Sequence, residues 1–306
     1  MAKNIQKTLI ILGGATASGK TDLAIRLAQH FETEIVSADS RQFFREMNIG
    51  TAKPTTAELA AAPHHFVNNL SVTDAYSVGD FEREALAVLE NIFDRHDTAI
   101  CVGGTGLYLR ALCEGLDDLP KVDEKIKQDL QQQFEQEGIE VLQKMLENVD
   151  NEFFKHAEIQ NPMRLLRALG VSLTTGKPFS SFRTGEKKIR FFKPVYLKTN
   201  VERAVLYERI NSRVDAMLAA GLVEEVKSLS RFWHLNALRT VGYQEFFDYF
   251  EGKIPLAEAV DLVKQHSRNY AKRQETWFRK PISENQQYTG FAPDRFDDIL
   301  DFLKRQ

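Results

Sequence analysis

A loop of small residues between an apolar run and a helical segment constrains this chain more than any other feature. Residues 8–12 are apolar and typical of a buried strand, and residues 14–21 (GATASGKT) follow with the pattern GxxxxGK[ST]. A helix is expected over residues 21–31, with its leucines on one face. Loop amides and a helix N-terminus both attract anions, and Lys20 adds a full positive charge. The sequence therefore predicts a cradle for a di- or triphosphate.

Two further strand candidates alternate with helical segments. Residues 34–37 and 98–102 are short apolar runs, and residues 81–96 between them have hydrophobic side chains at helical spacing. Strands that alternate with helices are typical of a parallel sheet with helices on both faces. We therefore expect an α/β fold like that of the P-loop NTPases.

The pattern changes after residue 116. Residues 117–189 are polar and helical in character, and a strand-like run resumes at residues 190–199. We therefore predict a core made of residues 1–116 and 190–306, with a helix-rich C-terminal part, and an inserted all-helical domain at residues 117–189.

Charge is distributed unevenly along the chain. The 306 residues carry a net charge of −3, which by itself argues against a nucleic-acid partner. Residues 114–152, however, contain 12 acidic residues against four Lys, whereas residues 264–280 contain six Lys or Arg against one Glu. The average over the chain therefore hides a basic segment that could contact nucleic acid.

Within the basic segment, Lys264, Arg268 and Lys272 lie four residues apart and would share one helical face. Aromatic residues such as Tyr270 and Trp277 lie between and after them. Such a stripe is either a solvated surface, with its aromatic residues in the core, or a surface that contacts RNA phosphates. The excess of positive charge in an acidic protein favours the second interpretation.

Other classes of protein are disfavoured. No apolar stretch approaches the ~20 residues of a membrane helix, so no membrane partner is expected. Cys101 and Cys113 form neither a CxxC pair nor a disulfide framework. We therefore expect a cytoplasmic globular protein.

The loop alone does not say which phosphate chemistry is performed. A GTPase would need an Asn-Lys-x-Asp motif, and no Asn in this chain precedes a Lys. A P-loop ATPase would need an Asp at the end of a later strand to hold Mg²⁺, but residues 98–102 lead into Gly103-Gly104. A carboxylate instead follows the second strand, at Asp39. At the carboxyl edge of the sheet Asp39 could be a general base for a second substrate, or simply a loop former or helix cap.

Short motifs along the chain decide between these chemistries. Besides the loop they are ADSRQ at 38–42, NIGTAKP at 48–54, PHH at 63–65, VGGTGLY at 102–108, NPMRLLRAL at 161–169, RTVGYQ at 239–244 and YAKRQETWFR at 270–279. This ordered set resembles the tRNA dimethylallyltransferase family over most of the chain.

The resemblance implies transfer of a dimethylallyl group from dimethylallyl diphosphate to N6 of the tRNA adenosine at position 37, beside the anticodon. It implies that Asp39 takes the amine proton, while Lys20, Arg213 and Thr21 stabilise the departing diphosphate, with Mg²⁺ held by Thr21 as the cofactor. The residues implied to bind the diphosphate are Gly14, Ala15, Thr16, Ala17, Ser18, Gly19, Lys20 and Thr21.

The resemblance also implies a partner, the anticodon stem-loop of tRNA, bound by a protein that we expect to be a monomer. The residues implied to contact tRNA are Asp39, Ser40, Arg41, Gln42, Thr105, Lys127, Met163, Arg164, Leu165, Leu166, Arg167, Arg239, Gly242, Tyr243, Lys272, Arg273, Gln274, Trp277 and Arg279.

The chain departs from the family pattern at a few positions. Ala15 stands where proline is usual, while Arg41 and Phe43-Phe44 replace the usual Met and Val-Tyr. The departures leave Asp39 intact but put the base contacts of residues 41–44 in question.

Two other functions share some of these features. A nucleoside or small-molecule kinase would have the same loop and the same Asp, but no arginine-rich lid is evident. A non-catalytic RNA-binding protein regulated by a nucleotide is disfavoured, because Asp39 and Thr21 are both present.

Overall fold

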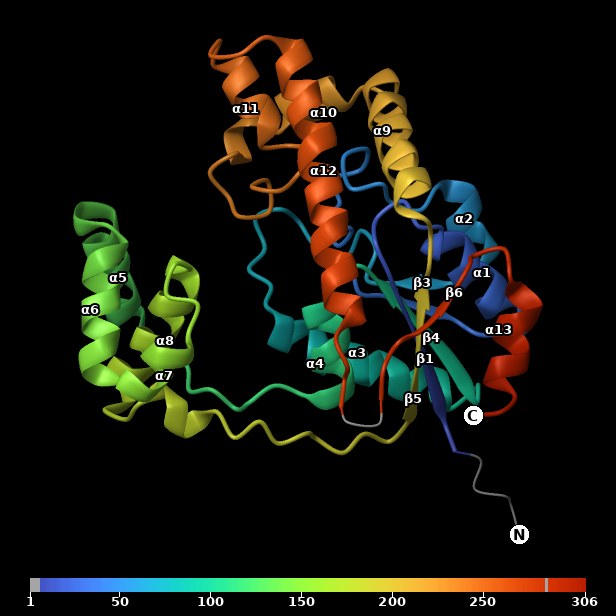
Figure 1. Cartoon of the computed structure of the whole chain (residues 1–306), viewed down its shortest axis with the longest axis horizontal. Helices are drawn as coiled ribbons and strands as arrows, with labels where there is room; N and C mark the ends of the chain where they lie inside the picture. The colour runs from blue at the N-terminus through green and yellow to red at the C-terminus, as the bar shows by residue number, and fades with distance from the viewer. Residues whose placement is uncertain (1–5, 284–285) are drawn as a thin grey trace. The chain divides into compact units, whose positions relative to one another are not determined.

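A parallel sheet of six strands organises the larger part of the molecule (Figure 1). The computed structural model describes residues 6–283 and 286–306. The strands lie in the order β3-β2-β4-β1-β5-β6, and all neighbouring strands are parallel. Their bounds are β1 (Thr8–Gly13), β2 (Ile35–Ser37), β3 (His64–His65), β4 (Thr98–Gly103), β5 (Lys193–Thr199) and β6 (Thr289–Phe291).

The central strand β1 alternates its side chains between two hydrophobic cores. Leu9 and Ile11 belong to a core that contains side chains of α3 (Val78–Phe93) and α4 (Gly106–Glu114). Ile10 and Leu12 belong to a core on the other face, with side chains of α1 (Lys20–His30) and α13 (Phe296–Leu303). A strand buried on both faces is typical of a parallel sheet covered by helices, as predicted from the sequence.

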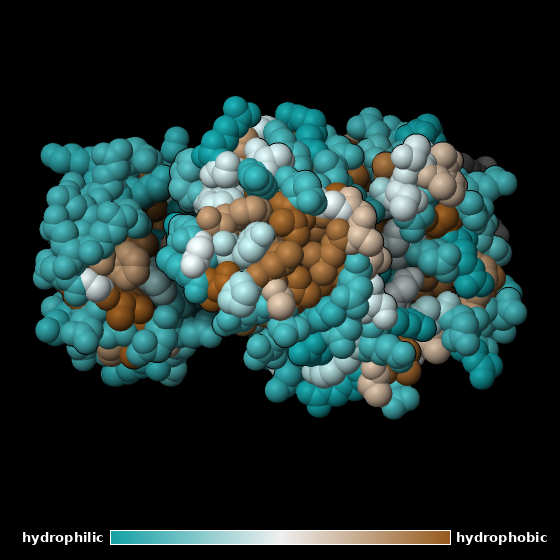
Figure 2. Space-filling model, turned by 90° about the horizontal axis from the view of Figure 1, so that it is seen from above, coloured by the Kyte–Doolittle hydropathy of each residue, from teal (hydrophilic) through white to brown (hydrophobic). Residues whose placement is uncertain are grey.

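A second group of helices extends beyond the carboxyl ends of the strands (Figure 1). It has its own hydrophobic core, to which each of its helices contributes or against which it packs. Its outer surface gathers hydrophobic residues in the region of α10 to α12 (Figure 2). The group consists of α9 (Arg203–Ala219), α10 (Leu222–Ser228), η2 (Ser230–Phe232), α11 (Glu245–Phe250) and α12 (Leu256–Arg279). The short α2 (Thr56–Ala61) precedes β3 and begins with a capping box formed by Thr55 and Glu58.

Residues Gly115–Lys188 form a separate compact unit made of helices. Its core is rich in leucine, and α8 begins with Asn161 as N-cap and Pro162 at its first position. The elements are α5 (Glu124–Glu137), α6 (Ile139–Val149), α7 (Asn151–His156), α8 (Pro162–Thr175) and η1 (Phe179–Phe182). The sequence predicted a helical domain at residues 117–189. The observed unit begins two residues earlier, at Gly115, and ends one residue earlier, at Lys188.

The structure confirms the predicted α/β class and differs from the sequence analysis at the edges of the sheet. The edge strands β3 and β6 have two and three residues, which is too short for an alternation of side chains to reveal. Helix α3 begins at Val78 rather than Phe81, because Ser77 and Asp80 form a capping box. Within the described part of the chain no helix is both long and apolar enough to cross a membrane.

Candidate active site at the carboxyl ends of the strands

A cavity of about 560 Å³ opens at the carboxyl ends of β1, β2 and β4. Its lining includes Lys20, Thr21, Asp39 and Arg213, the four residues to which the family resemblance assigns chemistry. Ligands of open parallel sheets bind outside the carboxyl ends of the strands, where loops from different strands converge. The cavity is therefore the candidate active site.

The phosphate loop connects β1 to α1 and lies along one wall of this cavity. Gly19 precedes α1 in the left-handed conformation, with φ of 86°. The Ser18 hydroxyl lies 2.7 Å from the Ala15 carbonyl oxygen, to which it donates, and 2.5 Å from the hydroxyl of Thr199 at the end of β5. At Gly14 a Cβ atom would lie 2.2 Å from the Thr199 hydroxyl oxygen. The loop is thus held against β5 by close contacts that leave no room for a side chain at Gly14.

Lys20 is the cation of the loop. Its Nζ donates a hydrogen bond to the carbonyl oxygen of Ala15, at 2.5 Å. Burial lowers the pKa of Lys20 to about 8; the negative charge of Asp39 opposes this shift, and the positive charge of Arg213 adds to it. An anion beside the loop would favour the charged lysine, so the cavity is suited to bind a diphosphate.

Arg213 contributes a second cation from α9. It lines the same cavity, where desolvation of the guanidinium lowers its pKa and the carboxylate of Glu58 opposes that shift, although the residue as a whole is exposed. Its position in the cavity lining agrees with a role in binding an anion.

Asp39 faces the cavity from the segment that follows β2. Its Oδ1 accepts a hydrogen bond from the backbone N–H of Arg41, at 3.0 Å. The Arg41 guanidinium in turn donates to the carbonyl oxygens of Asn236 and Ala237, at 3.1 and 3.3 Å. Asp39 therefore forms the loop, as one of the two sequence-based interpretations expected, and also presents a carboxylate to the cavity.

The end of β4 lies against the Asp39 segment. A Cβ atom at Gly103 would lie 2.3 Å from the carbonyl oxygen of Ala38, so the two backbones approach closely. The Thr105 hydroxyl accepts from the backbone N–H of Ser40, at 3.4 Å. Tyr270 of α12 lies near Thr105, and burial together with the charge of Asp39 raises the pKa of its phenol to about 12. The phenol therefore stays protonated at neutral pH.

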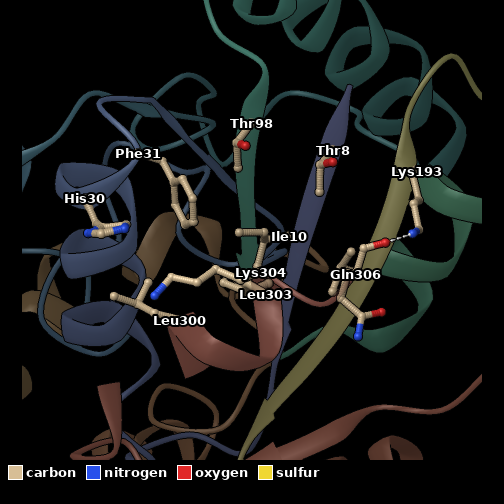
Figure 3. A pocket seen from close by; sticks show the side chains of 11 residues that line it. Thr8, Ile10, His30, Phe31, Thr98, Lys193, Leu300, Leu303, Lys304 and Gln306 are labelled. Atoms are coloured by element: carbon tan, nitrogen blue, oxygen red, sulfur yellow. Dashed lines mark hydrogen bonds between the residues drawn. The ribbon is translucent and has the colours of Figure 1, made fainter. Parts of the chain in front are cut away.

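A smaller cavity of about 170 Å³ lies at the opposite edge of the sheet. Thr8, Thr98 and Lys193, the first residues of β1, β4 and β5, line it, and Lys193 donates to the backbone oxygen of Gln306 (Figure 3). This edge holds the amino ends of the strands, so none of the loops that carry the candidate chemistry reaches it.

Comparison with known proteins gives the family of the chain. The model of the IPP transferase family matches residues 42–281. The chain belongs to this family. The resemblance drawn from the ordered motifs is therefore confirmed.

Relatives and solved structures agree with this assignment. A protein from Christiangramia forsetii named tRNA dimethylallyltransferase is 53% identical over 89% of this chain and 90% of its own length. A protein from Bacteroides thetaiotaomicron named tRNA dimethylallyltransferase 1 is 42% identical over 98% of this chain and 96% of its own length. The structure is similar to that of a tRNA isopentenylpyrophosphate transferase from Bacillus halodurans, with a TM-score of 0.71, 32% identity and coverage of 98% and 96% of the two chains. It is also similar to a eukaryotic dimethylallyltransferase acting on tRNA, with a TM-score of 0.83, 26% identity and coverage of 98% and 80%.

The residues that the family resemblance implicates in tRNA contact differ in burial in the larger unit, which comprises residues up to Glu114 and from Ile189 onward. Asp39, Ser40, Arg41, Gln42, Gly242 and Gln274 line the cavity. Arg239, Lys272, Arg273 and Arg279 are exposed, and Trp277 is partly buried beneath the guanidinium of Arg110. Tyr243 is fully buried, and its hydroxyl donates to Glu225 at 2.6 Å. The exposed cations are available to a partner, whereas Tyr243 stabilises the protein interior.

In the helical unit the implicated residues lie mainly on α8. Met163 is 71% exposed, and Arg164 and Arg167 are exposed beside it. Leu165 is fully buried in the core of the unit and Leu166 is partly buried. On α5, Lys127 is exposed and pairs with Glu124. The exposed side chains of α8 form one surface, which Leu165 supports from within.

The predicted stripe of cations on α12 is divided between two environments. Lys264 pairs with Asp215 of α9 at 2.5 Å, and Arg268 donates to Asn211 of α9 at 2.6 Å. Only Lys272 of the three is exposed. The expectation that all three would face a partner was wrong, because helical spacing shows which residues share a face and not which element covers that face.

Some residues that hold the site together from a distance carry no local sequence signal. Glu225 of α10 accepts hydrogen bonds from the backbone N–H groups of Asn48, Ile49 and Gly50, at 2.9–3.1 Å. It thereby fixes the loop that carries Gly50 and Lys53 into the cavity wall. No local pattern around Glu225 predicts this contact.

The pKa of Lys20 generates a prediction about anion binding. Because Lys20 is charged below a pKa of about 8 and a bound anion favours the charged form, affinity for inorganic diphosphate is expected to fall as the pH rises above 8. The decrease approaches about tenfold per pH unit until the pKa of the complex is reached. Titration calorimetry across this range measures it. The Lys20→Arg variant, which stays protonated, is the control: parallel pH profiles for both proteins would contradict the prediction.

Proposed function

We propose that the protein transfers a dimethylallyl group from dimethylallyl diphosphate to N6 of the adenosine at position 37 of tRNA. The observation that carries the proposal is the convergence of the phosphate loop and a carboxylate, Asp39, in the lining of one cavity. The membership of the IPP transferase family supports it. The relatives that match nearly the whole chain carry the name tRNA dimethylallyltransferase.

The chemistry assigns a task to each group in the cavity. The N6 lone pair of adenine forms a bond to C1 of the dimethylallyl group, and the bond from C1 to the diphosphate oxygen breaks. Diphosphate leaves with the electron pair, and Asp39 accepts the proton that the amine loses. Negative charge grows on the leaving group, so Lys20, Arg213 and the loop amides stabilise the transition state more than the bound substrate.

The residues at the loop fit a magnesium ion that is held mainly by the substrate. Mg²⁺ commonly keeps several waters and binds through substrate phosphates with few protein ligands. Thr21 presents its hydroxyl at the start of α1, and among the described residues no group of three or more His, Cys, Asp or Glu could hold a metal. Thr21 would be the protein ligand, and the ion would supply charge neutralisation on the diphosphate.

Recognition of RNA requires cations outside the cavity and space for an extruded base inside it. Lys272, Arg273 and Arg279 are exposed along α12, whose Tyr270 and Gln274 line the cavity. Phosphate contacts of this kind orient an RNA, and the adenine must leave its stack to reach Asp39. One helix would thus contact both the RNA backbone and the reacting base.

The decisive experiment offers two reactions to the same protein. It is incubated with Mg²⁺, labelled dimethylallyl diphosphate and an unmodified anticodon stem-loop with adenosine at position 37; a stem-loop with guanosine there is the matched control. We expect label in a modified adenosine of the first RNA only, and loss of the reaction when EDTA removes Mg²⁺. ATP consumption with a small-molecule acceptor, without transfer of label to RNA, would instead identify a kinase.

Removal of the proposed base is expected to affect the chemical step. The Asp39→Asn variant should lower the single-turnover rate of prenyl transfer by about 10²–10⁴-fold, because the amine then lacks a proton acceptor. Its affinity for tRNA, measured by filter binding, should change little. Asp261→Asn, on the exposed face of α12, is the matched control. Equal losses of rate and affinity in Asp39→Asn would assign Asp39 to RNA binding instead.

Removal of the exposed cations is expected to affect RNA binding. The double variant Lys272→Ala with Arg273→Ala should weaken tRNA binding and reduce the slope of log affinity against log salt by about one unit for each RNA phosphate that the protein no longer binds. Lys304→Ala with Arg305→Ala, which removes two exposed cations at the end of the chain, is the control. An unchanged salt slope in the first variant would place the RNA-binding cations elsewhere.

A further inference from the structure

The side chain of Gln274 bridges two loops at the base of the cavity. It lies on α12 with 6% of its surface exposed. Its Oε1 accepts a hydrogen bond from the backbone N–H of Thr16, at 2.8 Å, and its Nε2 donates to the carbonyl oxygen of Gly104, at 2.9 Å. A planar amide offers an acceptor and a donor side by side, so one residue satisfies both backbone groups.

The two loops serve the two substrates of the proposed reaction. Thr16 belongs to the phosphate loop, which would hold the donor. Gly104 immediately precedes Thr105, whose hydroxyl accepts from the backbone N–H of Ser40 beside Asp39. Gln274 therefore connects the donor side to the acceptor side through three hydrogen bonds: its own two and the one from Ser40.

Steric contacts show that α12 is pressed directly onto the ends of β1 and β4. A Cβ atom at Gly104 would lie 2.2 Å from Gln274 Nε2, and one at Gly106 would lie 1.9 Å from Trp277 Nε1. At Gly13 a Cβ atom would lie 2.4 Å from the ring of Phe278. Gln274 and two side chains one turn further along the helix, Trp277 and Phe278, thus each contact a glycine. This packing leaves the amide of Gln274 little freedom to move.

We propose that Gln274 is a positioning residue that sets the separation between the diphosphate cradle and the Asp39 segment. The inference rests on the proposed function. Because the same helix carries Lys272 and Arg273 on its exposed face, Gln274 also connects the surface offered to RNA with the phosphate loop. Loss of the amide would leave the buried carbonyl of Gly104 and the partly buried N–H of Thr16 without this partner and free the loop to shift relative to β4.

The first test separates positioning from RNA contact. Gln274→Leu, which has neither donor nor acceptor, is expected to lower the single-turnover rate at saturating substrates at least tenfold and to weaken binding of inorganic diphosphate, while tRNA affinity changes less than twofold. Gln265→Leu, the same change on the exposed face of α12, is the control. Weaker tRNA binding with an unchanged rate at saturation would overturn the proposal and show that Gln274 contacts RNA.

The second test uses protonation. In Gln274→Glu a carboxylate accepts from Thr16 but cannot donate to Gly104, whereas the protonated acid does both. Because burial raises the pKa of a carboxyl group, the acid form is expected to be accessible. The rate of this variant relative to wild type at each pH should therefore rise as the pH falls. A ratio independent of pH would contradict the bridging role, since a merely structural defect does not depend on this proton.

The third test changes Gly104, the residue whose carbonyl oxygen accepts from Gln274. In Gly104→Ala the new methyl group would lie 2.2 Å from Gln274 Nε2 and would push that amide out of its bridging position, and Gly104 has no left-handed backbone conformation to strain. We expect the rate and diphosphate affinity of Gly104→Ala to match those of Gln274→Leu, and the double variant to be no worse than either. Additive losses would refute the bridge. Folding of every variant is checked by thermal unfolding, and Gly104→Ala keeps the test decisive if Gln274→Leu does not fold.

The readouts also distinguish the bridge from the proposed function. If the wild-type protein binds inorganic diphosphate but transfers no prenyl group to RNA, the proposed function fails while the effect of Gln274→Leu on diphosphate affinity can still be measured.

Discussion

The parallel pairing of β1 with β4 and β5 is the constraint on which the site depends. The register places Gly13 opposite Gly103 and Lys198, and β2 pairs with β4 so that Ser37 lies opposite Val102. Since the strands run in the same direction, the loops after β1, β2, β4 and β5 all emerge at one edge of the sheet. The phosphate loop, the Asp39 segment and the Gly104 turn are neighbours for this reason, although they are far apart in the sequence.

The parts of the site that are encoded locally could be predicted from the sequence. The strand, loop and helix of residues 8–30 follow from a hydrophobic run, a motif and a helical period, and the structure places α1 within one residue of its predicted bounds. The position of Asp39 follows from a rule about parallel sheets. Arg213 was assigned by the family resemblance, because the chain itself offers no local signal for it.

Contacts between distant segments could not be predicted. Gln274 is 258 residues from Thr16, Thr199 is 181 from Ser18, and Glu225 is at least 175 from the amides that it binds. Each is a polar residue on an ordinary helix or strand, and only the fold determines its partner. The same limit explains Lys264 and Arg268: helical spacing grouped them with Lys272, but α9 covers the first two.

The three glycines that meet α12 have a consequence for how this protein can change during evolution. At each of Gly13, Gly104 and Gly106, an added methyl group would collide with a side chain of α12. A larger residue at one of these positions would require a smaller or repositioned one at Phe278, Gln274 or Trp277. The strand ends and the last turns of α12 are therefore expected to vary together among relatives, as coupled pairs rather than as independent sites.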